Sequence, residues 1–220
     1  MQQDSGVDFL RSHFDSLPEG LIASSPDSTL YAQYSQPTDR YGHGILGDAI
    51  EAGQLVVWHN GVVLTHTLDD SYVFEDLVPR LIDLDGDGEL EIVTIRTHVS
   101  RGAGIAIYKI NGDSLAEHAR VREIGTSSRW LNIAAMFDLD GDGTMEIAWV
   151  QTPHIGGILR VARMAEGELE VMAESTLYSN HEIGQRNLSL SVVAEEGGFY
   201  LIQRGADPAG NEAAHRALTR

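Results

Sequence analysis

The chain has 220 residues, of which 42% are hydrophobic and 22% are charged, and this composition excludes wholesale disorder and a collagen-like structure. The 33 Asp and Glu residues outnumber the 15 Lys and Arg residues, which gives a net charge of -18. Such a charge argues against binding a nucleic-acid backbone or an anionic membrane surface. The chain contains no cysteine, so disulfides, zinc–thiolate sites, iron–sulfur clusters and a cysteine nucleophile are excluded. The excess of carboxylates indicates cations as ligands.

The N-terminal residues 1–6 have neither a basic region nor an apolar region, so we do not expect a signal peptide here. No run of 18 or more apolar residues could span a bilayer, and membrane insertion is not expected. Two interpretations follow. Either the protein is cytoplasmic, or the chain begins after a removed signal.

A short N-terminal helix is predicted within an arm of residues 1–19. Val7, Leu10, Phe14 and Leu17 fall on one helical face, and Pro18 ends the run. From residue 20 onward, short β-branched segments alternate with Gly, Asp and Asn. Residues 54–58 and 62–67 flank an Asn-Gly pair, the pattern typical of a β-hairpin.

Further strands are expected along the rest of the chain, and a frayed helix or a disordered end is expected over residues 206–220. The expected strands are 30–36, 77–82, 90–96, 104–110, 131–137, 145–151, 157–164, 187–193 and 199–203.

An internal repeat organises these strands. Residues 81–92 reappear as residues 136–147, so the period is 55 residues, and residues 104–112 match residues 157–167. A third, degenerate copy begins at Asn187, and its turn has lost the aspartates. A repeat of this size that contains about four strands is typical of a propeller blade.

The predicted fold class is therefore all-β, a small β-propeller of about four blades with a short N-terminal helix. The propeller spans residues 20–205, and an N-terminal strand closes the ring by pairing of residues 20–36 with residues 187–203. The expected blades are 20–70, 75–123, 130–178 and 183–205.

Two turns read D-x-D-G-D-G-x-x-E, with side-chain oxygens at positions 1, 3, 5 and 9 and a backbone carbonyl at position 7. The glycine at position 6 permits a sharp bend, and Ca²⁺ takes six to eight oxygen ligands. We therefore expect two Ca²⁺ sites. The first uses Asp83, Asp85, Asp87, the carbonyl of Glu89, and Glu91; the second uses Asp138, Asp140, Asp142, the carbonyl of Thr144, and Glu146.

The same turns allow two other interpretations. An EF-hand needs a bidentate Glu at position 12, where this chain has Thr94 and Trp149, and an exiting helix in place of the β-branched residues 91–96. The second alternative is that the Asp-Gly residues only form hairpin corners. Two copies that share aspartates at positions 1, 3 and 5 and a Glu at position 9 favour calcium.

The two Leu-Asp-Gly-Asp-Gly turns, each followed by an acidic residue and an apolar strand, resemble the FG-GAP/VCBS-type repeats of integrin-like β-propellers. The resemblance is specific over residues 75–175 and weak over residues 30–68 and 183–205. It implies that the aspartate turn joins the first two strands of a blade and binds Ca²⁺. It also implies a secreted or cell-surface binding module more often than an enzyme. The outer repeats depart from the pattern because they lack the turn.

A possible ligand face comes from loops rich in His and Arg, which would converge on one face of a propeller. Its candidates are Arg40, His43, His98, His154, His181 and Arg186, with Arg129 and Trp130 nearby in sequence. Several of these histidines are expected in loops that follow the second strand of a repeat. The alternative is that these side chains hydrogen-bond the loop backbone and fill the axis. No G-x-S-x-G, H-E-x-x-H, P-loop or G-x-G-x-x-G fingerprint accompanies them.

Two functions remain open: a calcium-stabilised module that presents loop surfaces to a protein or glycan partner, and a propeller lyase or hydrolase that uses the His and Arg loops. The binding module requires only the repeats and aspartate turns that the sequence contains, so an enzyme is the less favoured interpretation. No catalytic residue or organic cofactor is assigned. Turns without a position-12 ligand are expected to bind Ca²⁺ with the low affinity of extracellular modules. We therefore predict periplasmic or extracellular residence, with the cytoplasm as the alternative. The oligomeric state is left open.

Overall fold

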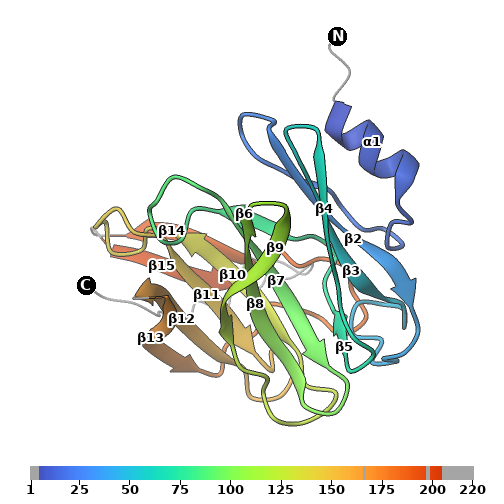
Figure 1. The fold of residues 1–220 in the computed structure, drawn as a ribbon. Coiled ribbons are helices and arrows are strands. Elements are labelled where there is room, and N and C mark those ends of the chain that lie inside the picture. Colours follow the sequence, from blue (N-terminus) through green and yellow to red (C-terminus); the bar gives the residue numbers. More distant parts are fainter. Residues whose placement is uncertain (1–4, 166, 197–198, 205–220) are drawn as a thin grey trace. The chain divides into compact units, whose positions relative to one another are not determined.

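The computed structural model describes residues 5–165, 167–196 and 199–204. Within these residues the chain forms one helix, α1 (Ser5–His13), and 15 β-strands (Figure 1). The predicted all-β class is confirmed. The chain divides into two compact units. Unit 1 comprises Met1–Ile82 and Leu90–Ser128, and unit 2 comprises Asp83–Glu89 and Arg129–Arg220.

Unit 1 is built on one antiparallel sheet with the strand order β1-β2-β3-β5-β7-β8-β9, where β4 pairs with β3 and β6 pairs with β7. Strands β3, β7 and β8 are buried along most of their length, which explains why they read as nearly continuous apolar runs. The strands are β1 (Ala23–Ser24), β2 (Leu30–Thr38), β3 (Glu51–His59), β4 (Val62–Thr67), β5 (Tyr72–Phe74), β6 (Arg80–Ile82), β7 (Glu91–His98), β8 (Gly102–Asn111) and β9 (Ser114–Val121).

The hairpin expected around Asn60-Gly61 is confirmed as β3 and β4, which pair from His59↔Val62 outward. Asn60 and Gly61 have φ values of 49° and 88°. Two consecutive positive φ values define the type I′ turn, which Asn-Gly adopts at low cost and which matches the twist of the strands.

Helix α1 packs on unit 1 through the apolar face that the sequence predicted. Leu10 is completely buried against Tyr31 and Val56, with Val7 and Phe14 packed beside them. The helix is shorter than the expected 7–17 and ends at His13, although the N–H of Phe14 still donates to the carbonyl of Leu10 at 3.1 Å.

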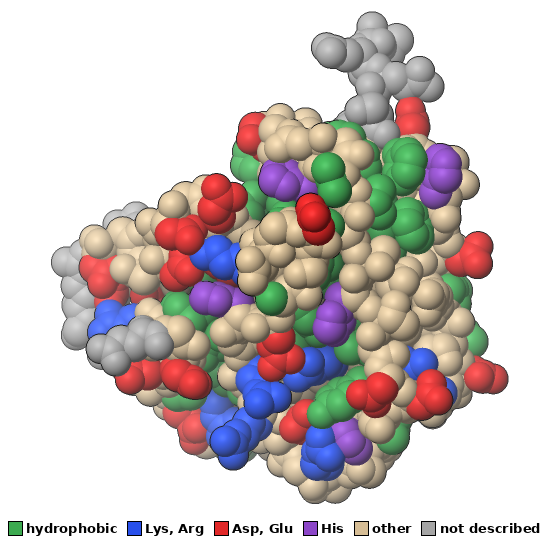
Figure 2. Space-filling model, in the orientation of Figure 1, with side chains coloured by type: hydrophobic (Ala, Val, Ile, Leu, Met, Phe, Trp, Pro, Cys, Tyr) green, Lys and Arg blue, Asp and Glu red, His purple; other side chains and the backbone are tan. Residues whose placement is uncertain are grey.

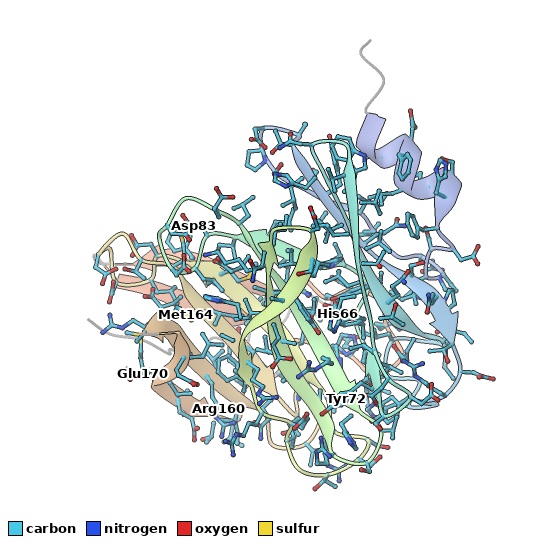
Figure 3. The ribbon with its side chains drawn as sticks, viewed as in Figure 1. His66, Tyr72, Asp83, Arg160, Met164 and Glu170 are labelled. Carbon is cyan, nitrogen blue, oxygen red and sulfur yellow. The ribbon has the colours of Figure 1, made fainter. Side chains whose placement is uncertain are left out.

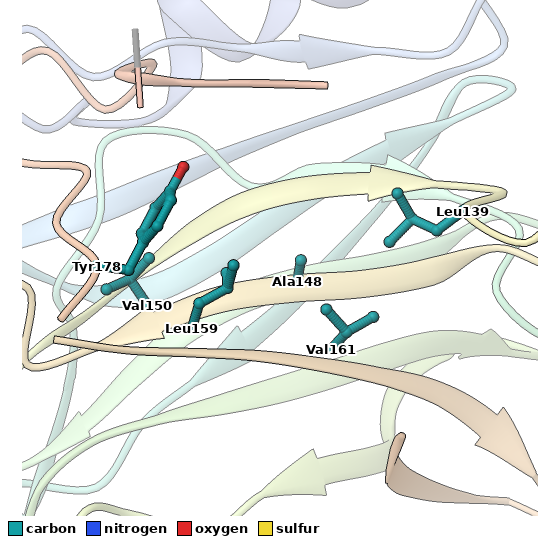
Figure 4. Close-up of a cluster of buried hydrophobic side chains, with 6 residues drawn as sticks. All are labelled: Leu139, Ala148, Val150, Leu159, Val161 and Tyr178. Atoms are coloured by element: carbon teal, nitrogen blue, oxygen red, sulfur yellow. The ribbon is translucent and has the colours of Figure 1, made fainter. Parts of the chain in front are cut away.

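Unit 2 contains a four-stranded antiparallel meander, β10-β11-β12-β13, and a separate hairpin of β14 and β15. Its core is the cluster Leu139, Ala148, Val150, Leu159, Val161 and Tyr178 (Figure 4). The strands are β10 (Leu131–Phe137), β11 (Glu146–Gln151), β12 (Ile158–Ala165), β13 (Glu168–Thr176), β14 (Ser191–Glu196) and β15 (Phe199–Arg204).

Strands β1, β5, β9 and β13 were not expected. The strands expected over residues 77–82 and 187–193 begin only at Arg80 and Ser191. The meander of unit 2 has the four strands expected of a blade. The described strand pairings contain no closed ring, so the number of blades and the ring closure stay predictions.

The expected helix over residues 206–220 lies outside the described residues. None of the described helices is long and apolar enough to cross a membrane.

Candidate metal centre and histidine loops

The second aspartate turn connects β10 to β11, as the repeat predicted. Gly141 and Gly143 have φ values of 77° and 92°, a left-handed conformation that glycine adopts without steric cost. These two positions let the backbone fold back on itself, so that successive N–H groups point into the loop.

The aspartates of this turn bind those inward N–H groups. One carboxylate oxygen of Asp138 accepts from the N–H of Gly141 at 2.7 Å and of Asp142 at 3.1 Å, and the other accepts from Gly143 at 3.0 Å. Asp140 accepts from the N–H of Asp142 at 3.2 Å. These bonds fix the carboxylates on the inside of the loop without a cation, and they also match what a hairpin corner would use.

Glu146 separates this turn from an ordinary hairpin corner. It is the first residue of β11 and only 1% of its surface is exposed. Its Oε2 accepts from the N–H of Leu139 at 2.7 Å, whereas its buried Oε1 has no hydrogen-bond partner among the described residues. One oxygen from each of Asp138, Asp140 and Glu146 lies within 4.8 Å of the others. Three carboxylates therefore converge on one point.

The electrostatics of Glu146 reflect this crowding. Burial raises the pKa of Glu146, the N–H of Leu139 opposes part of the rise, and the carboxylates of Asp140, Asp142 and Asp138 add to it. Desolvation and like charge both penalise the ionised form. A cation placed among these oxygens would reverse the second effect.

Asp142 and Thr144, the other expected ligands, lie differently. The carboxylate of Asp142 accepts from the N–H of Thr144 at 2.8 Å and lies 3.6 Å from the guanidinium of Arg163. The hydrogen bond from Thr144, with Arg163 as a smaller contribution, lowers the pKa of Asp142. Of the four carboxylates predicted for this site, Asp138, Asp140 and Glu146 converge, and Asp142 faces a cationic side chain.

The first aspartate turn, which lies between β6 and β7, repeats the local geometry (Asp83 in Figure 3). Asp83 accepts from the N–H of Gly86 at 2.7 Å and of Gly88 at 2.9 Å. Oxygens of Asp83, Asp85 and Asp87 lie within 4.8 Å of one another. Asp87 accepts from the N–H of the exposed residue Glu89 at 2.8 Å.

The carboxylate at position 9 distinguishes the two repeats. Glu91 is completely buried, like Glu146, but it forms an ion pair with Lys109 on β8, with 2.9 Å between Nζ and Oε1. Sequence reasoning missed Lys109 and Arg163. Both follow from the strand register, because the pairing Ile92↔Tyr108 places Lys109 across from Glu91, and Glu146 pairs with Arg163.

Both turns are thus acidic clusters that could bind a metal ion, and further acidic side chains are scattered over the face shown in Figure 2. Carboxylate and carbonyl oxygens are hard donors, suited to Ca²⁺ or Mg²⁺ rather than to soft transition metals.

Among the six candidates for the ligand face, His154 and His181 lie together in unit 2. His154 Nε2 is 3.0 Å from His181 Nδ1, and His181 Nε2 is 2.8 Å from the carbonyl oxygen of Gln185. The buried ring of Trp130 lies 4.7 Å from that of His181, between centroids. Arg186 follows in the same segment and is partly buried.

Arg40, His43 and His98 belong to unit 1 and contact its own groups. Arg40 Nε donates to the carbonyl of Tyr72 at 2.9 Å, and the His98 ring lies 4.8 Å from that of Tyr72, between centroids. His43 lies between β2 and β3, in the segment that precedes the second strand of that hairpin. Its Nδ1 is 2.5 Å from Glu75, a completely buried carboxylate.

These contacts favour a structural role for the three unit 1 residues. Burial raises the pKa of Glu75, and the hydrogen bond from His43 opposes that rise. A buried carboxylate needs such a partner, and this need is sufficient reason for a histidine at position 43. The convergence of all six candidates on one face stays a prediction.

A comparison with protein families matches residues 83–149 to the FG-GAP-like repeat. The matched stretch begins at the first aspartate of the first turn and ends in β11, after the second turn, so it covers both acidic clusters. No curated protein matches the chain. Residues 83–149 are therefore similar to an FG-GAP-like repeat, as the sequence resemblance predicted for this stretch.

Proposed function

We propose that the protein is a calcium-stabilised binding module of the integrin-like β-propeller type, which presents loop surfaces to a protein or glycan partner. The observation that supports it best is Glu146, a buried carboxylate with one oxygen unpartnered among the described residues, beside Asp138 and Asp140. Hairpin-corner chemistry explains the hydrogen bonds of the aspartates, but it does not explain why a third carboxylate is buried next to them.

Calcium fits this donor set better than magnesium does. Oxygens of Asp138, Asp140 and Glu146, together with the carbonyl predicted at Thr144, form a protein-rich oxygen shell of irregular geometry. Ca²⁺ accepts such a shell at 2.3–2.6 Å, whereas Mg²⁺ demands a near-octahedral shell and retains several waters. We therefore assign Ca²⁺ to the second turn.

The two turns differ in what neutralises the buried glutamate. Lys109 already supplies a positive charge to Glu91, whereas Glu146 has the like charges of three aspartates around it. Cation binding at the second turn therefore relieves the repulsion between Glu146 and the aspartates, whereas Glu91 already has the positive charge of Lys109 beside it. We expect the second turn to fill first as calcium is raised, and the first turn to bind more weakly.

The expected affinity for calcium indicates the compartment in which the protein functions. A shell with few protein carboxylates resembles the weak extracellular calcium modules, whose Kd is about 10⁻⁴–10⁻³ M. Such a site would stay empty at the submicromolar calcium of a cytosol, so the proposed residence is periplasmic or extracellular.

Isothermal titration of the metal-free protein with CaCl₂ tests the proposal. We expect one site with a Kd near 10⁻⁴ M and a weaker second one. Asp140→Asn should abolish the tighter site, and the matched variant Asp85→Asn should leave it intact. A titration without heat, together with equal melting temperatures in calcium and EDTA, would show that both turns are hairpin corners. Equal effects of the two variants would contradict the assignment of the tighter site.

A further inference from the structure

The guanidinium of Arg163, on β12, lies against the second aspartate turn. Its Nη1 is 3.6 Å from Oδ2 of Asp142 and 3.9 Å from Oδ2 of Asp140. In both aspartates the other oxygen, Oδ1, accepts a main-chain N–H, which belongs to Thr144 in one case and to Asp142 in the other. Arg163 therefore faces the two carboxylate oxygens that the main-chain hydrogen bonds of the turn do not use.

These oxygens are the ones that a metal ion would need. Asp142 is a predicted calcium ligand, yet it lies outside the converging group of Asp138, Asp140 and Glu146. The buried Oε1 of Glu146 has no hydrogen-bond partner among the described residues, which indicates independently that a cation enters here. A guanidinium is always positively charged, so Arg163 and Ca²⁺ would compete for the same carboxylates.

A second carboxylate lies across from Arg163 on the neighbouring strand. Arg163 pairs with Glu170 of β13, the edge strand of the meander (Glu170 in Figure 3). Directly paired residues of antiparallel strands have Cβ atoms about 4.5–5.5 Å apart and side chains on the same face. Glu170 is exposed and forms no ion pair within the part of the chain that the structure describes. The long side chain of Arg163 can therefore reach either the turn or Glu170.

The same two strands contain a matched pair in which this contact is made. Arg160 of β12 and Glu174 of β13 are also directly paired, and Arg160 Nε lies 2.8 Å from Glu174 Oε2. Arg163 has the same kind of cross-strand partner, but its guanidinium lies at the aspartates instead. The several carboxylates of the turn attract it more strongly than the single carboxylate of Glu170 as long as no cation occupies the turn.

We propose that Arg163 exchanges places with calcium: its guanidinium leaves Asp140 and Asp142 for Glu170 when Ca²⁺ binds the second turn, and Oδ2 of Asp142 then becomes a ligand. The inference rests on the proposed function, because it takes Ca²⁺ as the cation. Arg163 is a positioning residue in this exchange and sets the calcium affinity without binding the metal.

The exchange also connects the metal to the edge of the sheet. In the metal-free protein, β13 is held to β12 by main-chain pairing and by Arg160 and Glu174. An ion pair of Arg163 with Glu170 would add a second side-chain link in the presence of calcium. The edge strand of a sheet is where another chain can pair. Calcium should therefore slow amide hydrogen exchange along β13.

Calcium titrations of two arginine variants test the first half of the proposal. Arg163→Gln removes the competing charge and should tighten calcium binding about three- to tenfold. Arg160→Gln is the matched control on the same strand, because its guanidinium already lies on β13, and it should change the Kd by less than about twofold. An unchanged Kd for Arg163→Gln, or equal effects of the two variants, would overturn the proposal.

Glu170→Gln distinguishes an exchange from simple repulsion by a fixed charge. It leaves the displaced guanidinium without its carboxylate, so it should weaken calcium binding about two- to fivefold, the worth of an exposed ion pair. In the Arg163→Gln background the same substitution should have almost no effect. The double-mutant cycle isolates this coupling from the general loss of one negative charge. Equal effects of Glu170→Gln in both backgrounds would overturn the exchange.

Arginine side-chain ¹⁵N NMR observes the movement directly. Calcium should shift the Nε–H resonance of Arg163 in the native protein and leave that of Arg160 unchanged. All three substituted side chains are at least partly exposed, so the Tm in EDTA should stay within about 4 °C of the native value. Calcium binding with an unmoved Arg163 resonance would overturn only this inference, whereas the absence of calcium binding in both the native protein and Arg163→Gln would overturn the calcium assignment as well.

Discussion

Replacing Glu146 by glutamine should stabilise the protein without calcium and remove most of the stabilisation that calcium adds. Glu146 is almost fully buried, and one oxygen each of Asp138 and Asp140 lies within 4.8 Å of one of its own. Glutamine retains an oxygen that can accept from the N–H of Leu139, and it directs an amide donor toward the two aspartates. The variant therefore removes a charge and keeps the shape.

The size of the effect follows from Coulomb's law. Two unit charges 4.8 Å apart repel by about 0.9 kcal/mol in water and by about 3.5 kcal/mol at an effective dielectric constant of 20. The aspartates are in contact with solvent, and Arg163 lies 3.9 Å from Asp140, so values near the water limit apply. Two such neighbours give a gain of about 1–2 kcal/mol. For a domain of this size, that gain raises the Tm in EDTA by about 2–8 °C.

Calcium should stabilise the native protein and have almost no effect on the Glu146→Gln variant. At a free concentration tenfold above Kd, occupancy of the second turn adds RT ln 11, or about 1.4 kcal/mol, to the native protein. Its Tm should rise by about 3–6 °C over that in EDTA. In Glu146→Gln the ligand oxygen is neutral and the site is weakened, so the rise should nearly vanish. Differential scanning calorimetry in 5 mM CaCl₂ and in EDTA measures all four values.

Glu91→Gln is the matched control, because Glu91 occupies the same position of the other turn. Its ion pair with Lys109 is mostly buried, and its loss leaves an ammonium group without that carboxylate. We expect destabilisation of about 1–3 kcal/mol with and without calcium. The two glutamine variants should thus shift the Tm in EDTA in opposite directions. If the Tm in EDTA falls as much for Glu146→Gln as for Glu91→Gln, the reasoning is refuted. The ionised Glu146 would then stabilise the protein without calcium.

Two further predictions concern the second aspartate turn and the loop between β11 and β12. Burial and the neighbouring aspartates raise the pKa of Glu146, so without calcium the protein becomes more stable as the pH falls through that raised pKa, and protons compete with calcium over the same range. The difference in Tm between calcium and EDTA should therefore shrink between pH 7 and pH 5. A constant difference would contradict this linkage. Gly157→Ala should lower the free energy of unfolding of unit 2 by more than about 3 kcal/mol in urea, because the added Cβ meets the carbonyl of Tyr178. Gly156→Ala is the control: its φ is 74° and its Cβ would enter open space, so it should cost only about 1 kcal/mol. Equal costs would show that Gly157 and Tyr178 are not in close contact.

The sequence was sufficient to predict the aspartate turns, the central strands and the Asn-Gly hairpin, because each of these depends on local chemistry. Glycines at fixed offsets permit the bends, and alternating or continuous apolar runs form the strands. The repeat also aligned Glu91 with Glu146 and located both at the start of a strand. These features are confirmed by β7 and β11, which begin at these two residues.

Strands β9 and β13 could not be predicted in the same way. The exposed face of β13 carries glutamates, and Val171 and Met172 are also exposed, so no alternation of buried and polar residues marks this strand. Its extended conformation comes from pairing with β12 along its length. Tertiary context of this kind overrides weak β-propensity, and a single sequence contains little trace of it.

The difference between the two turns arises from the register between neighbouring strands and not from the turns themselves. Both turns share the same aspartates, the same left-handed glycines and the same inward hydrogen bonds, so turn geometry does not distinguish a metal site from a hairpin corner. What differs is the position of the positive side chain. Lys109 lies 2.9 Å from the buried Glu91, whereas Arg163 contacts Asp140 and Asp142 in the second turn. A lysine fixed in the sheet supplies a permanent positive charge, whereas a solution cation supplies one only at sufficient concentration. The stability of the second turn should therefore depend on calcium and that of the first on Lys109, and a Lys109→Met substitution should make the first turn the more calcium-dependent of the two.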